Sequence, residues 1–415
     1  MKFPGAHRFR LRVALCFIAI WCALVSTAQA QHFDIDGPRK KVTLPFKFER
    51  NSVIIPVTIN GNGPYNFILD SGVGLMLITE PKLVDSLNIS YKRLVTIPGL
   101  GEGDDAQAYI TGQLDVSVPG VKGYGISAAI LKTDNLNLSG FVGMPIHGII
   151  GYEFFNNLIV QVNFADTVLN IYRPKDITRI KRKGTKVPLL VEEKKPYLIS
   201  KVTLPDGSSS MNKLLIDLGA GHALSLDYLL QKKGMPDKFI AGNLGMGLNG
   251  PITGFISRAK LLDLGGYHVV APLTAFPDAN NTNIKPSVPR DGNVGMEILK
   301  RFKVTFDYTG GAVYLKKGYG FKEPFEHDMT GIEYYASGPG LEHIIISRVE
   351  PGSSGYDVGL ERGDEIVAIN FKPVYKMSLE EIDNLFKSRH ERTMLLEIYH
   401  SGKTDHVVLT LKRRI

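Results

Sequence analysis

The 415-residue sequence contains only two cysteines, Cys16 and Cys22, and both lie near its start. From residue 31 onward the chain therefore has no thiol for a disulfide, a cysteine metal site or a nucleophile. It also lacks an apolar run of the roughly 20 residues that an ordinary membrane helix needs. The formal net charge is +8, and residues 2–12 account for four of these charges. The remaining +4 is too small and too dispersed to predict nucleic-acid binding.

The first 30 residues have the pattern of an export signal. A basic head over residues 2–12 precedes a short apolar core over residues 13–25, and residues 28–30, Ala-Gln-Ala, form a small-x-small cleavage signal. We expect cleavage after Ala30 and an exported protein, either periplasmic or secreted. An uncleaved anchor is the alternative.

An apolar run in the first half ends abruptly on an acid. Residues 66–72 read Asn-Phe-Ile-Leu-Asp-Ser-Gly, with the acid at Asp70. A buried strand has no reason to end on a carboxylate unless the charge is satisfied, because an unpaired buried charge costs several kcal/mol. Residues 213–219 read Lys-Leu-Leu-Ile-Asp-Leu-Gly, with the acid at Asp217. The sequence therefore predicts two paired carboxylates, one from each half.

The order of features after each acid also repeats, and a long-period repeat indicates duplicated structural units. Gly-Ile-Ile-Gly at 148–151 comes before the alternating segment 159–164, and Gly-Asn-Val-Gly at 292–295 comes before the similar segment 303–308. The last glycine of the motif lies 81 residues after the acid in the first half and 78 residues after it in the second. Chance is a poor explanation of two such similar spacings.

These repeats, together with short strands and frequent turns, predict two β lobes over residues 42–173 and 187–317, joined by a basic linker around residues 181–184. The Gly-x-x-Gly segments at residues 148–151 and 292–295 are called the closing motifs below. Each lobe has a glycine-rich tip between its acid and its closing motif, and we expect each tip to form a mobile hairpin. The tip residues are Gly99, Leu100 and Gly101 in the first lobe and Gly245, Met246 and Gly247 in the second.

The ordered features resemble the aspartic peptidases of the pepsin and retroviral type, over both lobes. In that family each lobe contributes an Asp-Thr/Ser-Gly loop, a flap hairpin and an apolar-apolar-Gly motif that braces the loop. The resemblance implies a catalytic dyad of Asp70 and Asp217, supported by Ser71, Gly72 and Gly219, with no metal ion or organic cofactor. A single Asp-Ser-Gly also occurs in ordinary turns, so the inference depends on the repeated set of motifs.

The second lobe departs from the family pattern at Leu218, where the family has Thr or Ser. In the family those hydroxyls form hydrogen bonds across the dyad and hold the two loops in register. Leucine has no hydroxyl, so we expect half of this brace to be missing. Two functions therefore stay open: a working endopeptidase, or a catalytically impaired peptide-binding adaptor that keeps the fold. Nearby His222 is expected to be structural, because the mechanism gives it no role.

The last ninety residues differ in composition, and a linker near residues 318–326 separates them from the second lobe. Segments 344–354 and 359–370 are similar to the PDZ domain, which we expect over residues 327–415. Ser378 begins a capping box and so a helix. The resemblance places a carboxylate-binding loop here and implies binding of peptides or protein C-termini by strand addition. The loop residues are Gly331, Ile332, Glu333 and Tyr334. Packing of the domain on the lobes as a cover is the alternative.

We therefore predict a mainly β protein with two pseudo-symmetric retropepsin-like lobes, followed by an α+β PDZ domain. The expected function is endopeptidase hydrolysis of peptide bonds by water activated between Asp70 and Asp217. The expected partners are peptide or protein substrates and protein C-termini. We expect no nucleic-acid partner and no integral membrane segment after leader cleavage.

Overall fold

The structure, a computed structural model, describes most of the chain after the predicted export signal. It describes residues 31–87, 89, 92–97, 99, 101, 103–180, 183–227, 229, 234–278 and 287–415. The predicted signal over residues 1–30 and the flap residue Leu100 lie outside these ranges. Within them, no helix is both long enough and apolar enough to cross a membrane.

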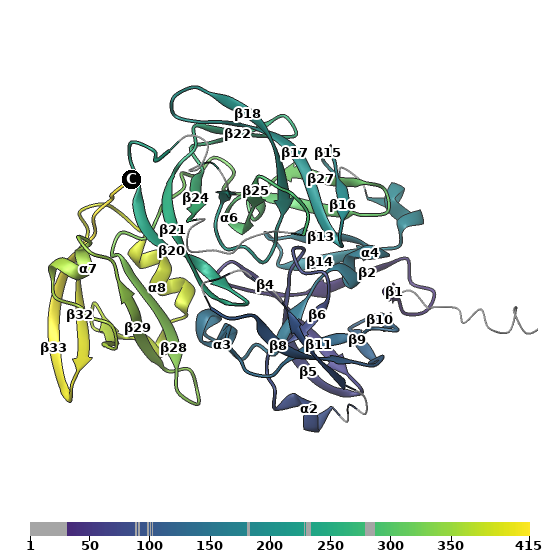
Figure 1. Cartoon of the computed structure of the whole chain (residues 1–415), viewed down its shortest axis with the longest axis horizontal. Coiled ribbons are helices and arrows are strands. Elements are labelled where there is room, and N and C mark those ends of the chain that lie inside the picture. The colour runs from purple at the N-terminus through teal and green to yellow at the C-terminus, as the bar shows by residue number, and fades with distance from the viewer. Residues whose placement is uncertain are drawn as a thin grey trace, which may run out of the picture.

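The first lobe is built on one large sheet (Figure 1), with strand order β1-β10-β9-β4-β5-β12-β6-β11-β8-β7 and β3 paired to β4. Its strands are β1 (His32–Ile35), β3 (Lys47–Glu49), β4 (Ser52–Ile59), β5 (Asn62–Leu69), β6 (Met76–Ile78), β7 (Lys92–Ile97), β8 (Ala106–Thr111), β9 (Val116–Val118), β10 (Val121–Tyr124), β11 (Ala128–Leu131) and β12 (Gly148–Ile150). Its helices are α2 (Leu83–Ser86), α3 (Leu138–Val142) and α4 (Tyr152–Asn156). Because β1 pairs with β10, this sheet also includes residues ahead of residue 42.

The second lobe has a similar sheet, with strand order β20-β21-β24-β19-β25-β18-β17-β22-β23 and β16 paired to β17. Its strands are β16 (Leu190–Glu192), β17 (Lys195–Thr203), β18 (Ser209–Ile216), β19 (Leu224–Leu226), β20 (Ile240–Gly247), β21 (Gly250–Arg258), β22 (Leu261–Leu264), β23 (Tyr267–Val270), β24 (Leu273–Pro277) and β25 (Gly292–Val294). Helix α6 (Met296–Leu299) follows β25, as α4 follows β12 in the first lobe.

The strand that leads to each acid occupies the same place in both sheets. Strand β5 runs parallel to β12, with Ile68 paired to Ile149, and β18 runs parallel to β25, with Leu215 paired to Asn293. Each closing motif therefore lies beside the strand that ends on its acid. The duplicated β architecture is thus present in the structure.

A six-stranded sheet joins the two lobes, with strand order β15-β27-β26-β13-β14-β2. Its strands are β2 (Lys41–Pro45), β13 (Ile159–Asn163), β14 (Val168–Tyr172), β15 (Thr185–Pro188), β26 (Phe302–Asp307) and β27 (Ala312–Lys317), and the 3₁₀ helix η1 (Pro174–Arg179) follows β14. Strands β13 and β26 meet at its centre, where Val160 is paired to Phe306. One apolar core runs through this sheet into both lobes, so the lobes form a single packed unit.

The C-terminal domain has its own sheet, with strand order β28-β29-β30-β32-β33 and β31 paired to β30, and its own apolar core. Its elements are β28 (Ile332–Ser337), β29 (His343–Val349), α7 (Ser354–Asp357), β30 (Glu365–Ile369), β31 (Lys372–Pro373), η2 (Val374–Lys376), α8 (Leu379–Phe386), β32 (Thr393–His400) and β33 (Lys403–Thr410). The predicted capping box is confirmed, because the side chains of Ser378 and Glu381 each accept the other's backbone N–H.

The linker to the C-terminal domain is fastened to the second lobe by one arginine. Arg301 donates to the carbonyl oxygens of Gly320, Glu323 and Pro324 and lies 3.6 Å from the ring centroid of Phe325. Its side chain is buried. These contacts restrict where the C-terminal domain lies relative to the lobes.

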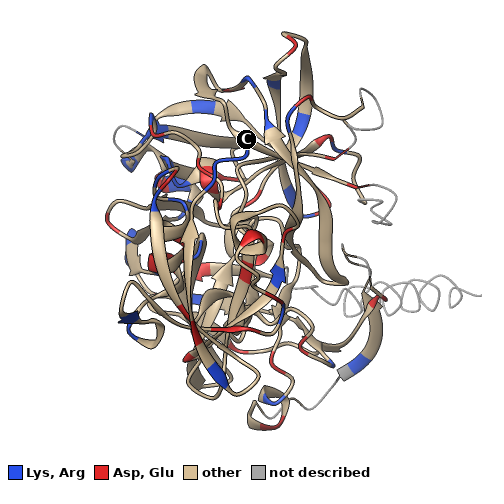
Figure 2. Cartoon of the chain, turned by 90° about the vertical axis from the view of Figure 1, so that its left-hand side faces the viewer, with Lys and Arg blue, Asp and Glu red and all other residues tan. Residues whose placement is uncertain are grey.

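Charge is dispersed over the folded chain. Figure 2 shows Lys and Arg positions interspersed with Asp and Glu positions along both lobes and the C-terminal domain. Oppositely charged neighbours are paired, as with Lys213 and Glu192 or Arg290 and Asp227. This pattern gives no support to a nucleic-acid partner.

Candidate active site

Each acid is held by a backbone hydrogen bond to the closing motif of its own lobe. Asp70 N donates to Ile150 O at 2.9 Å, and Asp217 N donates to Val294 O at 2.9 Å. Two loops of the same shape therefore present the acids, and the parallel pairing of β5 with β12 and of β18 with β25 sets their position.

The glycines that follow the acids let the two carboxyl groups meet. Gly72 N donates to Asp70 Oδ1 at 2.7 Å, and Gly219 N donates to Asp217 Oδ1 at 3.0 Å. A Cβ on Gly219 would overlap Asp70 Oδ2, and one on Gly72 would lie 2.9 Å from Asp217 Oδ1. Each carboxylate thus packs against the glycine of the opposite lobe, where any side chain would collide. The carboxyl group of Asp217 also lies close enough to that of Asp70 to raise the pKa of Asp70.

The environment of Asp70 favours its protonated form. Burial raises the pKa of Asp70 well above its ordinary value, and the negative charge of Asp217 raises it further. The hydrogen bond from Gly72 N opposes this shift only in part. Asp70 therefore keeps its proton to a higher pH than an ordinary aspartate does.

Ser71 connects the two acid loops across the lobes. Its hydroxyl donates to Ile216 O at 2.7 Å and accepts from Leu218 N at 3.0 Å, and its side chain is fully buried. One side chain therefore holds the residues immediately before and after Asp217. The hydroxyl of the first lobe therefore forms both of its hydrogen bonds to the acid loop of the second lobe.

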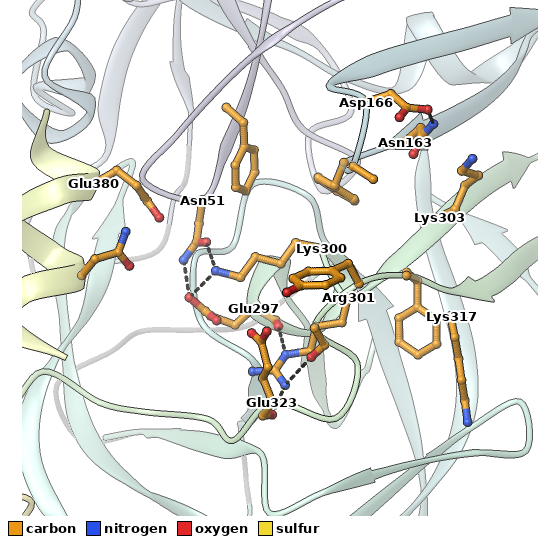
Figure 3. A pocket seen from close by; sticks show the side chains of 18 of the residues that line it. Asn51, Asn163, Asp166, Glu297, Lys300, Arg301, Lys303, Lys317, Glu323 and Glu380 are labelled. Carbon is orange, nitrogen blue, oxygen red and sulfur yellow. Dashed lines mark hydrogen bonds and ion pairs between the residues drawn. The ribbon is translucent and has the colours of Figure 1, made fainter. Parts of the chain in front are cut away.

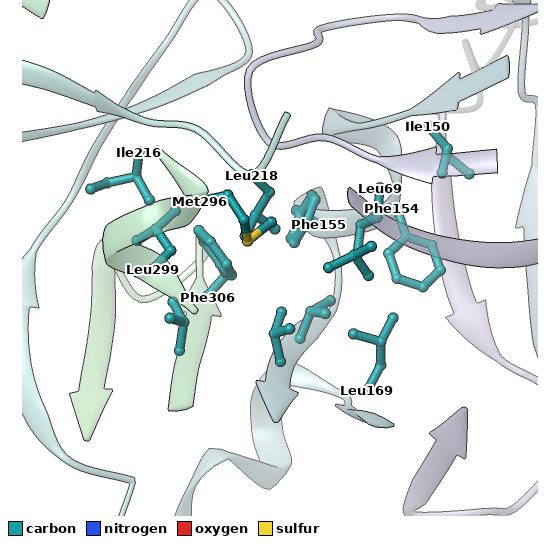
Figure 4. Packing of buried hydrophobic residues seen from close by; sticks show 14 of the residues in the cluster. Leu69, Ile150, Phe154, Phe155, Leu169, Ile216, Leu218, Met296, Leu299 and Phe306 are labelled. Carbon is teal, nitrogen blue, oxygen red and sulfur yellow. The ribbon is translucent and has the colours of Figure 1, made fainter. Parts of the chain in front are cut away.

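Leu218 contributes apolar packing in place of the second hydroxyl. Its side chain is fully buried in the core that the lobes share, and Figure 4 shows it next to Phe155 and Met296. Full burial of a leucine side chain stabilises a fold by about 1.5–3 kcal/mol. Leu218 therefore holds its loop against the shared core by apolar packing, although it forms no side-chain hydrogen bond across the dyad.

Asn293 is a site residue that the sequence analysis missed. Asn293 Nδ2 donates to Asp217 Oδ2 at 3.1 Å, and Asn293 Oδ1 lies 2.6 Å from His222 Nε2. Because the amide nitrogen donates to Asp217, the amide oxygen must accept, so His222 Nε2 carries the proton. Burial lowers the pKa of His222 and keeps the ring neutral. The available signal was an Asn where the other closing motif has Ile149.

Comparisons with known families agree with this geometry. Residues 55–154 match the family described as aspartyl protease, and residues 345–399 match the PDZ domain. The first match is an aspartyl-protease-like segment of the first lobe, and the second is a PDZ-like segment of the C-terminal domain. The predicted fold class is thereby confirmed: a mainly β protein with aspartic-protease-like lobes and a C-terminal PDZ domain.

Two solved structures resemble the chain at low identity. A photosystem II D1 C-terminal processing protease is 20% identical, with a TM-score of 0.21, and covers 23% of this chain and 25% of its own. The chain thus spans a quarter of the length of that protein. An aspartic proteinase from Irpex lacteus is 10% identical, with a TM-score of 0.42, and covers 68% of this chain and 99% of its own. The comparison with curated proteins found no match.

The two glycine-rich hairpins predicted as flaps touch each other. Gly103 N, between β7 and β8, donates to Asn249 O at 2.6 Å, between β20 and β21. Asn249 Nδ2 donates to Gly99 O at 3.2 Å and to Asp105 Oδ1 at 2.9 Å. Asn249 is therefore the residue that joins the tips, and the sequence analysis did not single it out. Four predicted tip residues besides Gly99 are described on these hairpins, namely Gly101, Gly245, Met246 and Gly247.

A cavity of about 650 Å³ lies away from the dyad, between the two lobes and α8 (Figure 3). Neither Asp70 nor Asp217 lines it. Asn51, Glu297 and Lys300 on its wall are hydrogen-bonded to one another at 2.9–3.0 Å. Its lining carries charged side chains of both signs, so the cavity indicates no particular ligand. Among the described residues, no group of His, Cys, Asp and Glu is placed to hold a metal ion.

The PDZ loop predicted to bind carboxylates lies at the start of the edge strand β28. Gly331 N donates to Asp328 Oδ1 at 2.6 Å, and Ile332 N donates to Thr330 Oγ1 at 3.1 Å. Amides that would receive a ligand carboxylate are therefore bonded within the domain.

The other two loop residues contact groups elsewhere in the fold. The Glu333 carboxylate accepts from the backbone and side-chain nitrogens of Asn243 on the second flap, at 3.3 and 3.2 Å. The hydroxyl of Tyr334 donates to Asp383 on α8. The loop thus links the PDZ domain to the protease lobes.

Glu153 and Glu297 occupy equivalent positions in the two lobes but have different partners. Glu153 lies two residues after the glycine that ends the first closing motif; it is almost fully buried, with Lys194 Nζ 3.8 Å away. Burial raises the pKa of Glu153 to about 7, despite the opposing effect of Lys194. Its counterpart Glu297 accepts hydrogen bonds from Asn51 and Lys300. Burial alone would raise the pKa of Glu297, but Lys300 and other partners outweigh burial and lower it.

We expect Glu153→Gln to stabilise the protein at pH 8 and to have little effect near pH 4.5. A raised folded-state pKa means that the folded state holds the proton, so the stabilising contribution is complete below the ordinary value of 4.5 and is lost as pH rises through about 7. The difference of two to three units corresponds to about 3 kcal/mol. Urea unfolding at both pH values measures it. Glu297→Gln is the matched control with the opposite sign, because its lowered pKa stabilises the fold at pH 8.

Proposed function

We propose that the chain is an aspartic-type endopeptidase in which water, activated between Asp70 and Asp217, hydrolyses peptide bonds. The observation that carries the proposal is the meeting of two carboxyl groups from equivalent loops of the two lobes, each packed against the glycine of the opposite lobe. The match to the aspartyl protease family over residues 55–154 supports it.

The neighbours of the dyad assign different roles to the two acids. Asp217 accepts N–H donors on both oxygens, from Gly219 and Asn293, and such donors stabilise a negative charge. Asp70 accepts one N–H donor, from Gly72, and its pKa is raised. Asp217 is therefore the ionised base, and Asp70 is the protonated acid.

In the proposed reaction, the Asp217 carboxylate removes a proton from a water molecule, and the water oxygen attacks the peptide carbonyl carbon. Asp70 donates its proton to the carbonyl oxygen, which gives a neutral tetrahedral intermediate. The proton on Asp217 then passes to the peptide nitrogen as the carbon–nitrogen bond breaks, and Asp70 regains a proton from a hydroxyl of the intermediate. The dyad ends in its starting state.

The second candidate function is a peptide-binding adaptor without turnover, which Leu218 favours because it removes one hydroxyl from the dyad brace. The test is incubation of the purified chain with an unfolded protein from pH 3 to pH 8, with mass spectrometry of the products. New peptide termini that grow linearly with enzyme concentration support the endopeptidase. Binding of peptides without new termini at any pH supports the adaptor.

Asn293→Leu is expected to shift the pH dependence of hydrolysis as well as its rate. The substitution removes a donor from Asp217 Oδ2 and introduces an apolar side chain of the kind found at the equivalent position, Ile149. Without that donor the charged base is less stable, so the acidic limb of the kcat/KM profile should move to higher pH, and kcat/KM should fall roughly tenfold, as for loss of a charge-assisted hydrogen bond. An unchanged limb would contradict this role of Asn293.

We also propose that the protein works outside the cytoplasm, on the basis of the export signal expected over residues 1–30. Its partners are peptides or proteins, because both the protease family and the PDZ domain act on polypeptides. Binding of protein C-termini by the PDZ domain belongs to this proposal.

A further inference from the structure

The ligand groove of the PDZ domain, between β28 and α8, is already in contact with the first lobe. Strand β28 is the terminal strand of its sheet, so one edge of its backbone has no neighbouring strand. PDZ ligands bind by adding a strand to such an edge. Here helix α3 of the first protease lobe packs on β28 (Figure 1). The question is whether this contact fills the groove.

Arg50, in the turn between β3 and β4, binds both walls of the groove. Its Nε and Nη2 donate to the Asp383 carboxylate on α8 at 3.0 and 3.1 Å. Its Nη1 donates to Phe141 O on α3 at 2.8 Å and to Tyr334 O on β28 at 3.4 Å. The guanidinium lies 4.9 and 4.8 Å from the ring centroids of Phe141 and Tyr334. Because the side chains of Arg50 and Asp383 are only 11% and 19% exposed, this ion pair is shielded from water.

The packing of α3 leaves no width for a peptide strand. A Cβ on Gly140 would lie 2.7 Å from Ala336 O on β28, and one on Gly143 would lie 2.8 Å from Leu379 Cγ at the start of α8. A ligand strand needs about 4.8 Å from the β28 backbone. Helix α3 therefore occupies the space in which a ligand strand would lie.

The backbone amides that would bind a ligand carboxylate already have hydrogen-bond acceptors within the domain. Asp328 Oδ1 accepts from Thr330 N at 3.0 Å and from Gly331 N at 2.6 Å, and Thr330 Oγ1 accepts from Ile332 N. A terminal carboxylate would need these same amide donors. A carboxylate of the domain itself thus stands in for that of a ligand.

We infer that the PDZ groove is an internal docking site: its occupant is the first protease lobe, through α3 and Arg50, with Asp328 in the place of a ligand carboxylate. The inference deepens the peptide-binding part of the proposed function and does not depend on catalysis. Since Glu333 on the same strand also accepts from Asn243 on the second flap, the docked groove fixes the PDZ domain against one lobe and one flap together. A peptide terminus enters the groove only after this docking is released.

The first test measures amide hydrogen exchange in the full chain. Arg50→Glu places a negative charge opposite Asp383 and should speed exchange over β28 and α8 at least about tenfold, because breaking one partner of a shielded ion pair costs more than one factor of ten. Asp383→Asn attacks the same pair from the PDZ side and should give a smaller increase. Lys412→Ala removes an exposed pair with Asp357 in the same domain and should change nothing there. Exchange within twofold of wild type in both groove variants overturns the inference.

The second test adds ligands to the full chain carrying Asp70→Asn, so that no peptide is hydrolysed if the chain is a protease. The probe is a fluorescent octapeptide library with four random C-terminal residues, compared as free acid and as amide. We expect fluorescence anisotropy to show no preference for the free acid. Preferential binding of the free acid with a Kd below about 10 μM shows an open groove and overturns the inference. Failure of the proposed protease activity would leave both measurements unaffected.

Discussion

Replacing Asp70 with asparagine is expected to lower kcat/KM for peptide hydrolysis by at least about 10³-fold. An amide at this position has no carboxyl proton to donate to the substrate oxygen and cannot share a proton with Asp217. A positioned general acid or base contributes about 10²–10⁴-fold to a rate, and this substitution removes the acid and disturbs the base beside it. Initial rates of formation of new peptide termini, measured at the pH optimum of the wild type, give the ratio.

Two further variants make this result interpretable. Asp217→Asn should lose as much activity as Asp70→Asn, because residues that act as one unit give equal and non-additive losses. Asp36→Asn changes an exposed aspartate in the turn after β1 and should keep full activity. Hydrolysis that survives Asp70→Asn in a pure preparation would assign the activity to something other than this dyad and would leave the adaptor function as the better account.

The dyad was accessible to sequence analysis because the chain repeats its own pattern. Each acid follows an apolar strand and comes before a glycine, and each is followed at similar distance by a glycine-flanked closing motif. In the structure that motif supplies the parallel neighbour of the acid strand, at β12 in one lobe and at β25 in the other. The repeated spacing therefore reflects a topological requirement, and this makes it readable from one sequence.

Other parts of the site depend on contacts that no local pattern reports. Asn293 acts on Asp217 across 76 positions, and Asn249 joins flap tips 144 to 150 positions apart. The occupant of the PDZ groove was hidden for the same reason, because Arg50 and Asp383 are 333 positions apart. Each of these contacts depends on single polar residues, and many other positions of the chain carry Asn, Arg or Asp without such a role.

Leu218 is a position where the sequence predicts the missing hydroxyl but not its structural consequence. The missing hydroxyl is visible in the sequence, but its consequence depends on whether the first lobe compensates. In the structure Ser71 alone bonds to both sides of Asp217, and Leu218 packs beneath the loop. The register of the two loops therefore rests mainly on one hydroxyl, and its removal should have a large effect.

Ser71→Ala is expected to destabilise the fold by roughly 2–5 kcal/mol and to reduce hydrolysis as well. The substitution leaves Leu218 N–H and Ile216 C=O buried without their partner, and each such group costs about 1–3 kcal/mol. Because the same two bonds align the acid loops, their loss lets the carboxyl groups shift relative to each other. A misplacement of about 1 Å can cost about 10²-fold in rate. Urea unfolding and initial rates measure the two effects separately.

Ser71→Thr is the matched control, because it keeps the hydroxyl and adds one methyl group in a fully buried position. We expect the added methyl group to cost about 1–3 kcal/mol through overpacking, and we expect the variant to retain most of the activity because the hydroxyl is kept. If Ser71→Ala unfolds and reacts like the wild type, the hydroxyl does not set the register, and the packing of Leu218 must do so. In that event Leu218→Ala should be the damaging substitution, because it leaves a cavity beneath the acid loop of the second lobe. Comparison of Ser71→Ala with Leu218→Ala therefore decides which lobe holds the two acids in position.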